Sequence, residues 1–369
     1  MGYFFSLVKN IDKLLLVLPL LFAAVSITLI ASITYTGGGL LNRATLVQGV
    51  CFVIGYFAIL FILLIDYKIF ERYEKLLYAA SLLFLFTVYV PGLGTDMNTG
   101  SHAWIDLGVT TMQPSEIVKI SFVLVFANFL SRNASHLLSL RGVFFAALYA
   151  APFLGIIMKE DFGSGLVLAV MCVGMVFYAG IDRRLFSRLA VAFLVAIPIL
   201  FRFMKDYQKR RIDAFLHPEN LSIQETWQVY QSKIAIGSGG LFGKGLFSGT
   251  QKELDFLPVQ ESDFIFAVAV EELGLVGGAA ILLLYLAFFL RIWRTVGRAK
   301  DMYGALIVVG ILCMFAFQAF ENIGMNMGIM PVTGIPLPLV SAGGTAVVAN
   351  LIAVGFVLNV GIRNKTINF

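Results

Sequence analysis

The residue that could most directly do chemistry is Asp263, a carboxylate that stands just before a long apolar stretch and behind a glycine-rich segment. An ionisable group at the edge of a membrane span is costly to maintain and often marks a functional site. Ser262 can cap the helix that follows, with Asp263 at its first position, where the helix dipole favours the charged form. We therefore predict an anionic Asp263. The alternative is that Asp263 only helps to cap the helix.

A second pair of charged residues, Glu116 and Lys119, lies one helical turn apart inside another apolar stretch. Pro114 suits the first turn of that helix, which places Glu116 beside unpaired amides. The pair is either an ion pair that helps to specify helix packing or the lining of a polar cavity that admits a charged headgroup. Deeper in a later span, at least one of Glu271 and Glu272 is expected to pair within the bundle, for example with Lys119.

The segment from about 204 to 262 carries the other polar candidates. Lys209, Arg210 and Arg211 form a basic cluster, which in most proteins meets anionic lipid headgroups and otherwise could hold a diphosphate. Apolar and aromatic residues recur at helical spacing between Ile223 and Ile234, which predicts a helix along the membrane interface. The glycines that follow do not match a phosphate-binding loop. They indicate either close backbone packing or a flexible outer loop.

Membrane helices must position these side chains. Hydrophobic residues make up 59% of the 369 positions and charged residues 13%, and the mean hydropathy is +0.89, which excludes an ordinary soluble domain. Crossing the hydrocarbon layer takes about 20 apolar residues. We predict an all-α polytopic membrane protein, one domain over residues 1–369, with ten transmembrane helices. The predicted spans are residues 14–35, 45–65, 76–91, 116–130, 142–158, 163–180, 185–203, 264–290, 303–325 and 343–360.

The distribution of Lys and Arg predicts the orientation. With the N-terminus inside, most Lys and Arg of the short loops lie inside, and the short outer loops hold only Arg43 and Lys159. Both termini are then cytoplasmic, and the large loop between the seventh and eighth helices is extracellular. Residues 324–344 also lie outside and are rich in proline and glycine, which excludes a continuous helix. Irregular backbone at membrane depth is tolerated only where it is buried in protein or lines a cavity.

Motifs in a fixed order run through nearly the whole chain. They are Trp-Ile-Asp-Leu-Gly at 104–108, Gln-Pro-Ser-Glu at 113–116 with Lys119, Asp161 with Gly163, and the stretches 231–245, 249–251, 255–258, 262–266, 271–274 and 322–344. Together they resemble the SEDS family (shape, elongation, division and sporulation). The stretches 249–251 and 254–256 favour its elongation branch over its division branch. Three positions depart from the family pattern: Ala103 stands where an arginine is common, Gln260-Glu261 replace the usual pair, and Ala342 occupies a frequent tyrosine position.

The resemblance implies a ten-helix peptidoglycan glycosyltransferase for cell elongation and shape control. Its substrate would be lipid II, the undecaprenyl-diphosphate-linked disaccharide pentapeptide, on the outer face of the bacterial cytoplasmic membrane. Its implied partner is a class B penicillin-binding protein, the transpeptidase that crosslinks the strand, and no nucleic acid is expected. The family's essential acid falls on Asp263.

The chemistry of that reaction assigns expected roles to the candidate residues. Lipid II is α-linked and the glycan is β-1,4-linked, so the sugar carbon is inverted by an acceptor hydroxyl that loses its proton. Asp263 would take this proton directly or by coordinating Mg²⁺ or Mn²⁺, because a carboxylate at a helix start is a weak base. The diphosphate candidates are, in decreasing order, Lys119, Lys233, Lys244 and Arg210. Glu116, Trp104 and Ser232 complete the predicted substrate-binding set.

Two other classes of function fit parts of the sequence. A lipid II flippase or transporter would also need ionisable residues and broken helices within the membrane. It predicts polar groups that reach the cytoplasmic half, whereas most candidates here gather toward the outer face. A structural scaffold of a cell-wall complex is the third class, and it should tolerate loss of Asp263.

Overall fold

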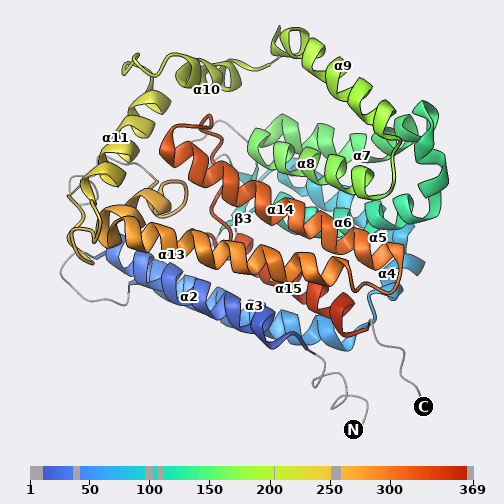
Figure 1. The fold of residues 1–369 in the computed structure, drawn as a ribbon, viewed down its shortest axis with the longest axis horizontal. Coiled ribbons are helices and arrows are strands. Elements are labelled where there is room, and N and C mark those ends of the chain that lie inside the picture. The colour runs from blue at the N-terminus through green and yellow to red at the C-terminus, as the bar shows by residue number, and fades with distance from the viewer. Residues whose placement is uncertain are drawn as a thin grey trace.

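A computed structural model describes residues 11–35, 42–95, 103–106, 111–202, 204–250 and 259–363. The motif positions at 107–108, 251 and 254–258 lie outside these described residues. Within them, each of the ten predicted spans coincides with a helix (Figure 1). These helices are α2 (Lys13–Ile33), α3 (Arg43–Leu64), α5 (Glu74–Phe86), α6 (Pro114–Asn133), α7 (Leu140–Glu160), α8 (Phe162–Tyr178), α9 (Arg183–Arg202), α13 (Ile265–Val296), α14 (Met302–Met327) and α15 (Gly344–Ile362).

The lengths and apolar character of these helices support a protein that crosses the membrane several times. Seven helical segments among the described residues are long and apolar enough to cross a membrane, and α8 is a shorter apolar helix. The helices α5 and α9 are not among the seven. The all-α polytopic class is therefore confirmed, and ten complete crossings stay a prediction.

Short elements connect these helices. They are α4 (Lys68–Arg72), η1 (Thr87–Tyr89), η2 (Ala134–Leu138), α10 (Asp206–Leu216), α11 (Gln224–Ser238) and the strands β1 (Gly94–Thr95), β2 (Trp104–Asp106) and β3 (Thr111–Met112). The strands form an antiparallel sheet in the order β1-β2-β3, with Gly94 opposite Ile105 and Ile105 opposite Met112. This sheet immediately precedes α6 in the chain. The segment predicted to be helical forms α11, with Trp227 and Tyr230 exposed on its surface, and its place at the membrane interface stays a prediction.

The late helices form the centre of the bundle. The helix α14 packs against α6, α8 and α13, while α15 packs against α3 and α13 against α2. Close approach needs small residues at the crossing points: a Cβ on Gly55 of α3 would clash with Leu351 of α15. By contrast, α9 and α10 extend along the periphery, away from this centre (Figure 1).

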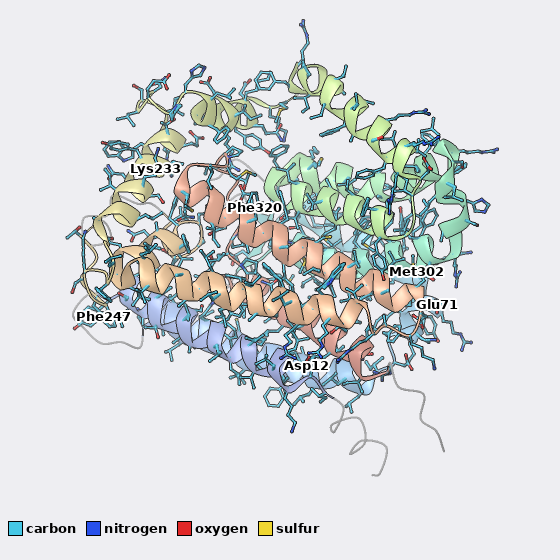
Figure 2. All side chains as sticks on the ribbon, viewed as in Figure 1. Asp12, Glu71, Lys233, Phe247, Met302 and Phe320 are labelled. Carbon is cyan, nitrogen blue, oxygen red and sulfur yellow. The ribbon has the colours of Figure 1, made fainter. Side chains whose placement is uncertain are left out.

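The N-terminal end of α2 and the C-terminal end of α15 lie at the same end of the bundle. Asp12 pairs with Arg291 at 3.6 Å, and Lys68 pairs with Asp301 at 2.9 Å. Arg363, just after α15, pairs with Asp66 at 3.3 Å. Glu71 and Met302 belong to this end, while Lys233 and Phe247 lie at the other (Figure 2). An even number of crossings requires this arrangement, so it supports the predicted topology.

The glycine-rich segment clamps a kink in α13. Gly274 has φ +72° inside the helix, where the regular hydrogen bonding breaks. The amides of Lys244 and Gly245 donate to the carbonyl oxygens of Glu271 and Glu272, each at 3.0 Å, and the Leu275 amide donates to the Gly240 carbonyl at 2.9 Å. Of the two interpretations offered for these glycines, the described residues favour close backbone packing.

Candidate active site

The backbone of Asp263 is held from two sides. Its carbonyl oxygen accepts hydrogen bonds from Asn322 Nδ2 at 3.0 Å and from Asn326 Nδ2 at 2.9 Å, both on α14. The carbonyl of the preceding residue, Ser262, accepts a hydrogen bond from the hydroxyl of Ser341. Because these donors belong to the central helix and to the irregular segment after it, Asp263 has a fixed position that does not depend on its own side chain.

The expected helix cap at this position is wrong. The helix α13 begins at Ile265, its N-cap residue is Phe264, and no side chain caps it. Asp263 therefore precedes the helix and does not occupy its first position. Ser262 donates its hydroxyl to Asp263 Oδ1 at 2.7 Å instead of capping the helix. The Asp263 carboxylate therefore takes no part in capping the helix.

The carboxylate of Asp263 and the guanidinium of Arg211 both lie close to Gly334. A Cβ built on Gly334 would lie 3.5 Å from Asp263 Oδ2 and 3.7 Å from an Arg211 Nη atom. Gly334 has φ +73°, a conformation that favours glycine, and the absent side chain leaves room for both charged groups. Arg211 also donates to the carbonyl of Thr333, and its guanidinium lies 5.8 Å from the ring centroid of Tyr207.

The surroundings raise the pKa of Asp263. Burial raises this pKa most, and the nearby charges of Asp161 and Glu261 raise it further. The hydrogen bond from Ser262 and the positive charge of Arg211 lower it, but burial outweighs them. The carboxylate is therefore a better proton acceptor than the weak base expected from a helix start.

Asp161 joins this group from the α7–α8 connection. It caps α8 by accepting the Ser164 amide at 3.1 Å, and its other oxygen accepts Gln113 Nε2 at 2.7 Å. Two residues on, a Cβ at Gly163 would lie 3.0 Å from the carbonyl oxygen of Thr333. Asp161 therefore lies across the irregular segment from Arg211 and Asp263.

A further acid, Glu321 of α14, lies beneath the same segment. It is fully buried, and neither carboxylate oxygen has a hydrogen-bond partner among the described residues.

The pair Glu116–Lys119 forms as an ion pair inside the bundle. Lys119 Nζ lies 2.7 Å from Glu116 Oε1, and the side chains are only 1% and 4% exposed. The suggested pairing of Lys119 with Glu271 or Glu272 is therefore wrong. Glu271 instead pairs with Lys244 at 2.7 Å, and Glu272 accepts the Ser32 hydroxyl at 2.6 Å. The burial of Lys119 favours its packing role over headgroup contact.

Removing one member of this pair should be costly. Lys119→Met leaves Glu116 buried and unpaired, so we expect a loss of about 3–5 kcal/mol in the free energy of unfolding. The double variant Glu116→Gln, Lys119→Met removes both charges and should recover most of it. Unfolding of the detergent-solubilised protein measures both. A stable Lys119→Met variant that makes no product would instead favour the headgroup cavity.

The other predicted substrate contacts are spread over the described residues. Ser232 is fully buried and donates to the Asn326 carbonyl at 2.8 Å, so it supports the helix that holds Asp263. Lys244 Nζ is engaged by Glu271 and by the Thr250 hydroxyl at 2.6 Å. Lys233 is exposed on α11 and packs beside Gly328.

Arg210 and Trp104 complete the predicted set. Arg210 is exposed on α10, and its neighbour Arg211 is the one whose charge acts on Asp263. Trp104 lies in β2 opposite Thr95 and is partly buried. No contact between either residue and Asp263 is present among the described residues, so their substrate roles stay predictions.

The residues around Asp263 can be compared with the needs of a divalent ion. Within the described parts of the chain, no three His, Cys, Asp or Glu side chains gather as a metal site would require. Mg²⁺ is often bound through only one or two carboxylates, with substrate phosphates and water as the other ligands. Asp263 is a single carboxylate of the kind that this mode of binding requires.

Comparisons of sequence connect this arrangement to known proteins. The family model of FtsW, RodA and SpoVE, described as cell cycle proteins, matches residues 6–366. Stage V sporulation protein E of Bacillus subtilis (strain 168) is 39% identical, covering 83% of this chain and 84% of that protein. Peptidoglycan glycosyltransferase MrdB of Escherichia coli (strain K12) is 38% identical, covering 82% and 81%. Peptidoglycan glycosyltransferase RodA of Treponema pallidum (strain Nichols) is 31% identical, covering 96% and 98%.

Solved structures share the fold. A chain from a peptidoglycan synthase complex that coordinates polymerization and crosslinking superposes with a TM-score of 0.78, at 26% identity over 95% of this chain and 97% of that chain. Thermus thermophilus RodA superposes with a TM-score of 0.70, at 26% identity over 96% and 98%.

Proposed function

Since this chain belongs to the SEDS family of FtsW, RodA and SpoVE and is a peptidoglycan glycosyltransferase, we propose that it polymerises lipid II at the end of the bundle that holds Asp263. The family resemblance drawn from the motifs is thereby confirmed. The observation that carries the proposal is that the Asp263 carboxylate and the Arg211 guanidinium both lie close to Gly334, where the charge of Arg211 acts on Asp263. An inverting transfer from a diphosphate requires a base and a cation in the same site.

The two side chains divide the reaction between them. Asp263 accepts the proton of the acceptor 4-hydroxyl as its oxygen forms a bond to the donor sugar carbon. The bond from that carbon to the diphosphate oxygen breaks on the opposite face, and undecaprenyl diphosphate leaves. Arg211 binds the charge that develops on this leaving group, since its planar guanidinium can donate to two phosphate oxygens at once.

A divalent cation, Mg²⁺ or Mn²⁺, belongs to the proposal. Asp263 would hold it together with the substrate diphosphate, and the ion would supply further neutralisation of the leaving charge. Burial and the neighbouring carboxylates of the protein raise the pKa of Asp263. Its proposed role as proton acceptor therefore rests on these groups and does not depend on the cation.

The cellular setting of the reaction is also part of the proposal. We place the site on the outer face of the bacterial cytoplasmic membrane, with both termini in the cytoplasm, in agreement with the charge distribution. The motifs favour a role in elongation, whereas the similar proteins include both a sporulation protein and RodA. A class B penicillin-binding protein is the proposed partner, supported by the likeness to a chain of a synthase complex.

Purified protein with lipid II tests the activity and the cation together. We expect glycan polymer on a gel, a loss of at least about tenfold when EDTA removes the cation, and recovery when Mg²⁺ or Mn²⁺ is added back. Undiminished polymer after exhaustive chelation would remove the cation from the proposal. Movement of lipid II between leaflets without any polymer would contradict the polymerase and support the flippase.

A further inference from the structure

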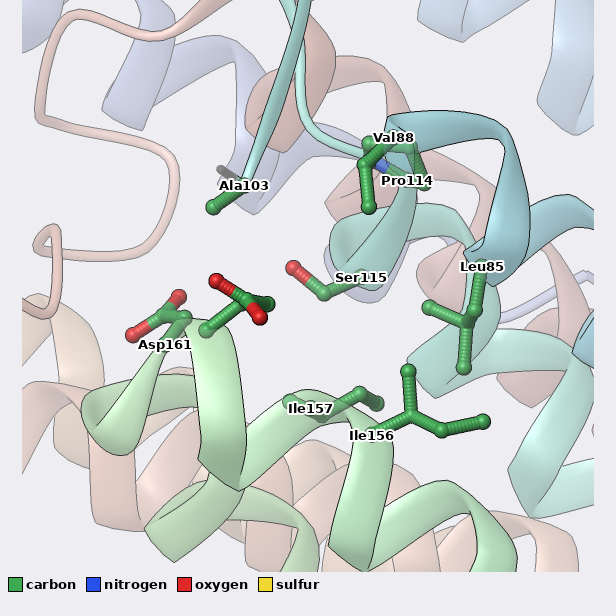
Figure 3. A pocket seen from close by; sticks show the side chains of 9 residues that line it. Leu85, Val88, Ala103, Pro114, Ser115, Ile156, Ile157 and Asp161 are labelled. Atoms are coloured by element: carbon green, nitrogen blue, oxygen red, sulfur yellow. The ribbon is translucent and has the colours of Figure 1, made fainter. Parts of the chain in front are cut away.

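A small hollow lies beside Asp161, between the sheet and the ends of α6 and α7 (Figure 3). The hollow is small and partly open to the outside, so it suits at most one short substituent of a larger molecule. Its lining residues are Leu85, Val88, Ala103, Pro114, Ser115, Ile156, Ile157, Glu160 and Asp161.

Ala103 forms part of the wall of this space with its methyl group. A larger side chain at this position would extend into the hollow, so the small alanine helps to keep the space open.

The lining offers a specific combination of groups. Ser115 is 7% exposed, and its hydroxyl has no hydrogen-bond partner among the described residues. An unpaired buried hydroxyl is unfavourable, so a ligand atom that pairs with it would gain binding energy. Asp161 lies at the edge of the same hollow, and the side chains of Ile156 and Ile157 supply an apolar wall (Figure 3).

The hollow is connected to the proposed reaction centre. Asp161 lines it, and the charge of Asp161 acts on Asp263. Gly163 packs directly on the carbonyl of Thr333, whose neighbour Gly334 lies between Asp263 and Arg211. A sugar whose hydroxyl reaches Asp263 can therefore extend a substituent past Asp161.

We propose that this hollow binds the 2-acetamido group of the acceptor sugar, an inference that rests on the proposed function. The Ser115 hydroxyl donates to the amide carbonyl, the Asp161 carboxylate accepts the amide N–H, and the methyl group packs on the isoleucines. An ammonium group would suit the carboxylates, but it would leave the apolar wall unused and could not accept the serine proton. The acetamido group uses all three kinds of lining.

The variant Ser115→Ala distinguishes a role of the serine hydroxyl in substrate binding from a role in protein stability. Because the serine hydroxyl is buried and unpaired, its removal should leave the melting temperature unchanged or raise it. The same variant should raise KM for lipid II about fivefold to tenfold with a smaller change in kcat. Unchanged kinetics in a protein of unchanged stability would overturn the role of Ser115 in the hollow.

The size of the hollow can be changed at Ala103. With wild-type protein, a lipid II analogue whose terminal sugar carries a propionyl in place of the acetyl group should react at least about tenfold less efficiently in kcat/KM. Ala103→Gly makes room for the extra methylene and should reduce this discrimination. Ala103→Leu fills the hollow and should raise KM for natural lipid II. Ala151→Leu, the same change at an exposed position of α7, is the matched control and should have neither effect.

The outcomes distinguish this inference from the function on which it rests. If the wild type polymerises lipid II but both Ala103 variants keep its acetyl preference, the inference fails and the polymerase stands. A preference for substrate with a free amine in place of the acetamido group would also overturn it. If the wild type makes no polymer from lipid II, the proposed function fails and the inference falls with it.

Discussion

Asp263→Asn is expected to lower glycan polymerisation by about 10²–10⁴-fold, the usual contribution of a positioned general base. Asparagine has nearly the same shape as aspartate but cannot accept the hydroxyl proton. The protein should remain folded and inserted, because Asn322 and Asn326 hold the backbone carbonyl of residue 263 and do not contact its side chain. Polymer formation on a gel and thermal unfolding in detergent measure the two halves of this expectation.

A matched control for this variant lies two residues before it in the chain. Glu261 is a partly buried carboxylate whose charge contributes to the raised pKa of Asp263. Glu261→Gln should therefore change the rate only slightly, by shifting that pKa downward. Full polymerisation by Asp263→Asn, or equal losses in the two variants, would remove Asp263 from the role of proton acceptor.

Much of this fold follows from the pattern of apolar residues. The predicted spans coincide with helices because long apolar stretches have few other stable structures in lipid. The irregular segment after α14 was also predictable, since Pro331, Pro336 and Pro338 cannot continue a helix. Asp263 could be selected because it is an acid at the edge of a span. In each case the relevant signal is local in the sequence.

The contacts between distant segments could not be predicted in this way. The pairing of Lys244 with Glu271 depends on how the glycine-rich segment folds back over the kink at Gly274. Helical spacing in the sequence did not show that α13 would begin at Ile265, two residues after Asp263. The position of Glu321 beneath Thr333 likewise depends on the path of the irregular segment. These features require tertiary structure.

Arg211 is an intermediate case, because a signal in the sequence could have identified it. Within α10, Gln208 and Ala214 are buried, and Arg211 stands between them at a spacing of three residues in each direction. That spacing places the three residues on one helical face. Arg210 lies off this face and is exposed. Applying the helical period to the basic cluster would therefore have selected Arg211 as the inward-facing cation.

Arg211→Gln should lower polymerisation by about 10²–10³-fold, comparable to the loss of one charge-stabilising donor in other active sites. Glutamine keeps much of the length of the side chain but cannot bind the diphosphate as a cation. Arg210→Gln, one residue away on the exposed face, is the matched control and should stay within about threefold of the wild type, since exposed charges contribute little. Equal losses in the two variants would assign the effect to the general basic surface of α10.

The pH profile gives this variant a second, independent readout. The positive charge of Arg211 lowers the pKa of Asp263, so its removal raises that pKa further. Proton acceptance requires the ionised carboxylate, and activity is lost as the pH falls through this pKa. The residual activity of Arg211→Gln should therefore decline at a higher pH than that of the wild type, whereas the decline for Arg210→Gln should not move. An unshifted acid limb in Arg211→Gln would show that the guanidinium does not act on the carboxylate.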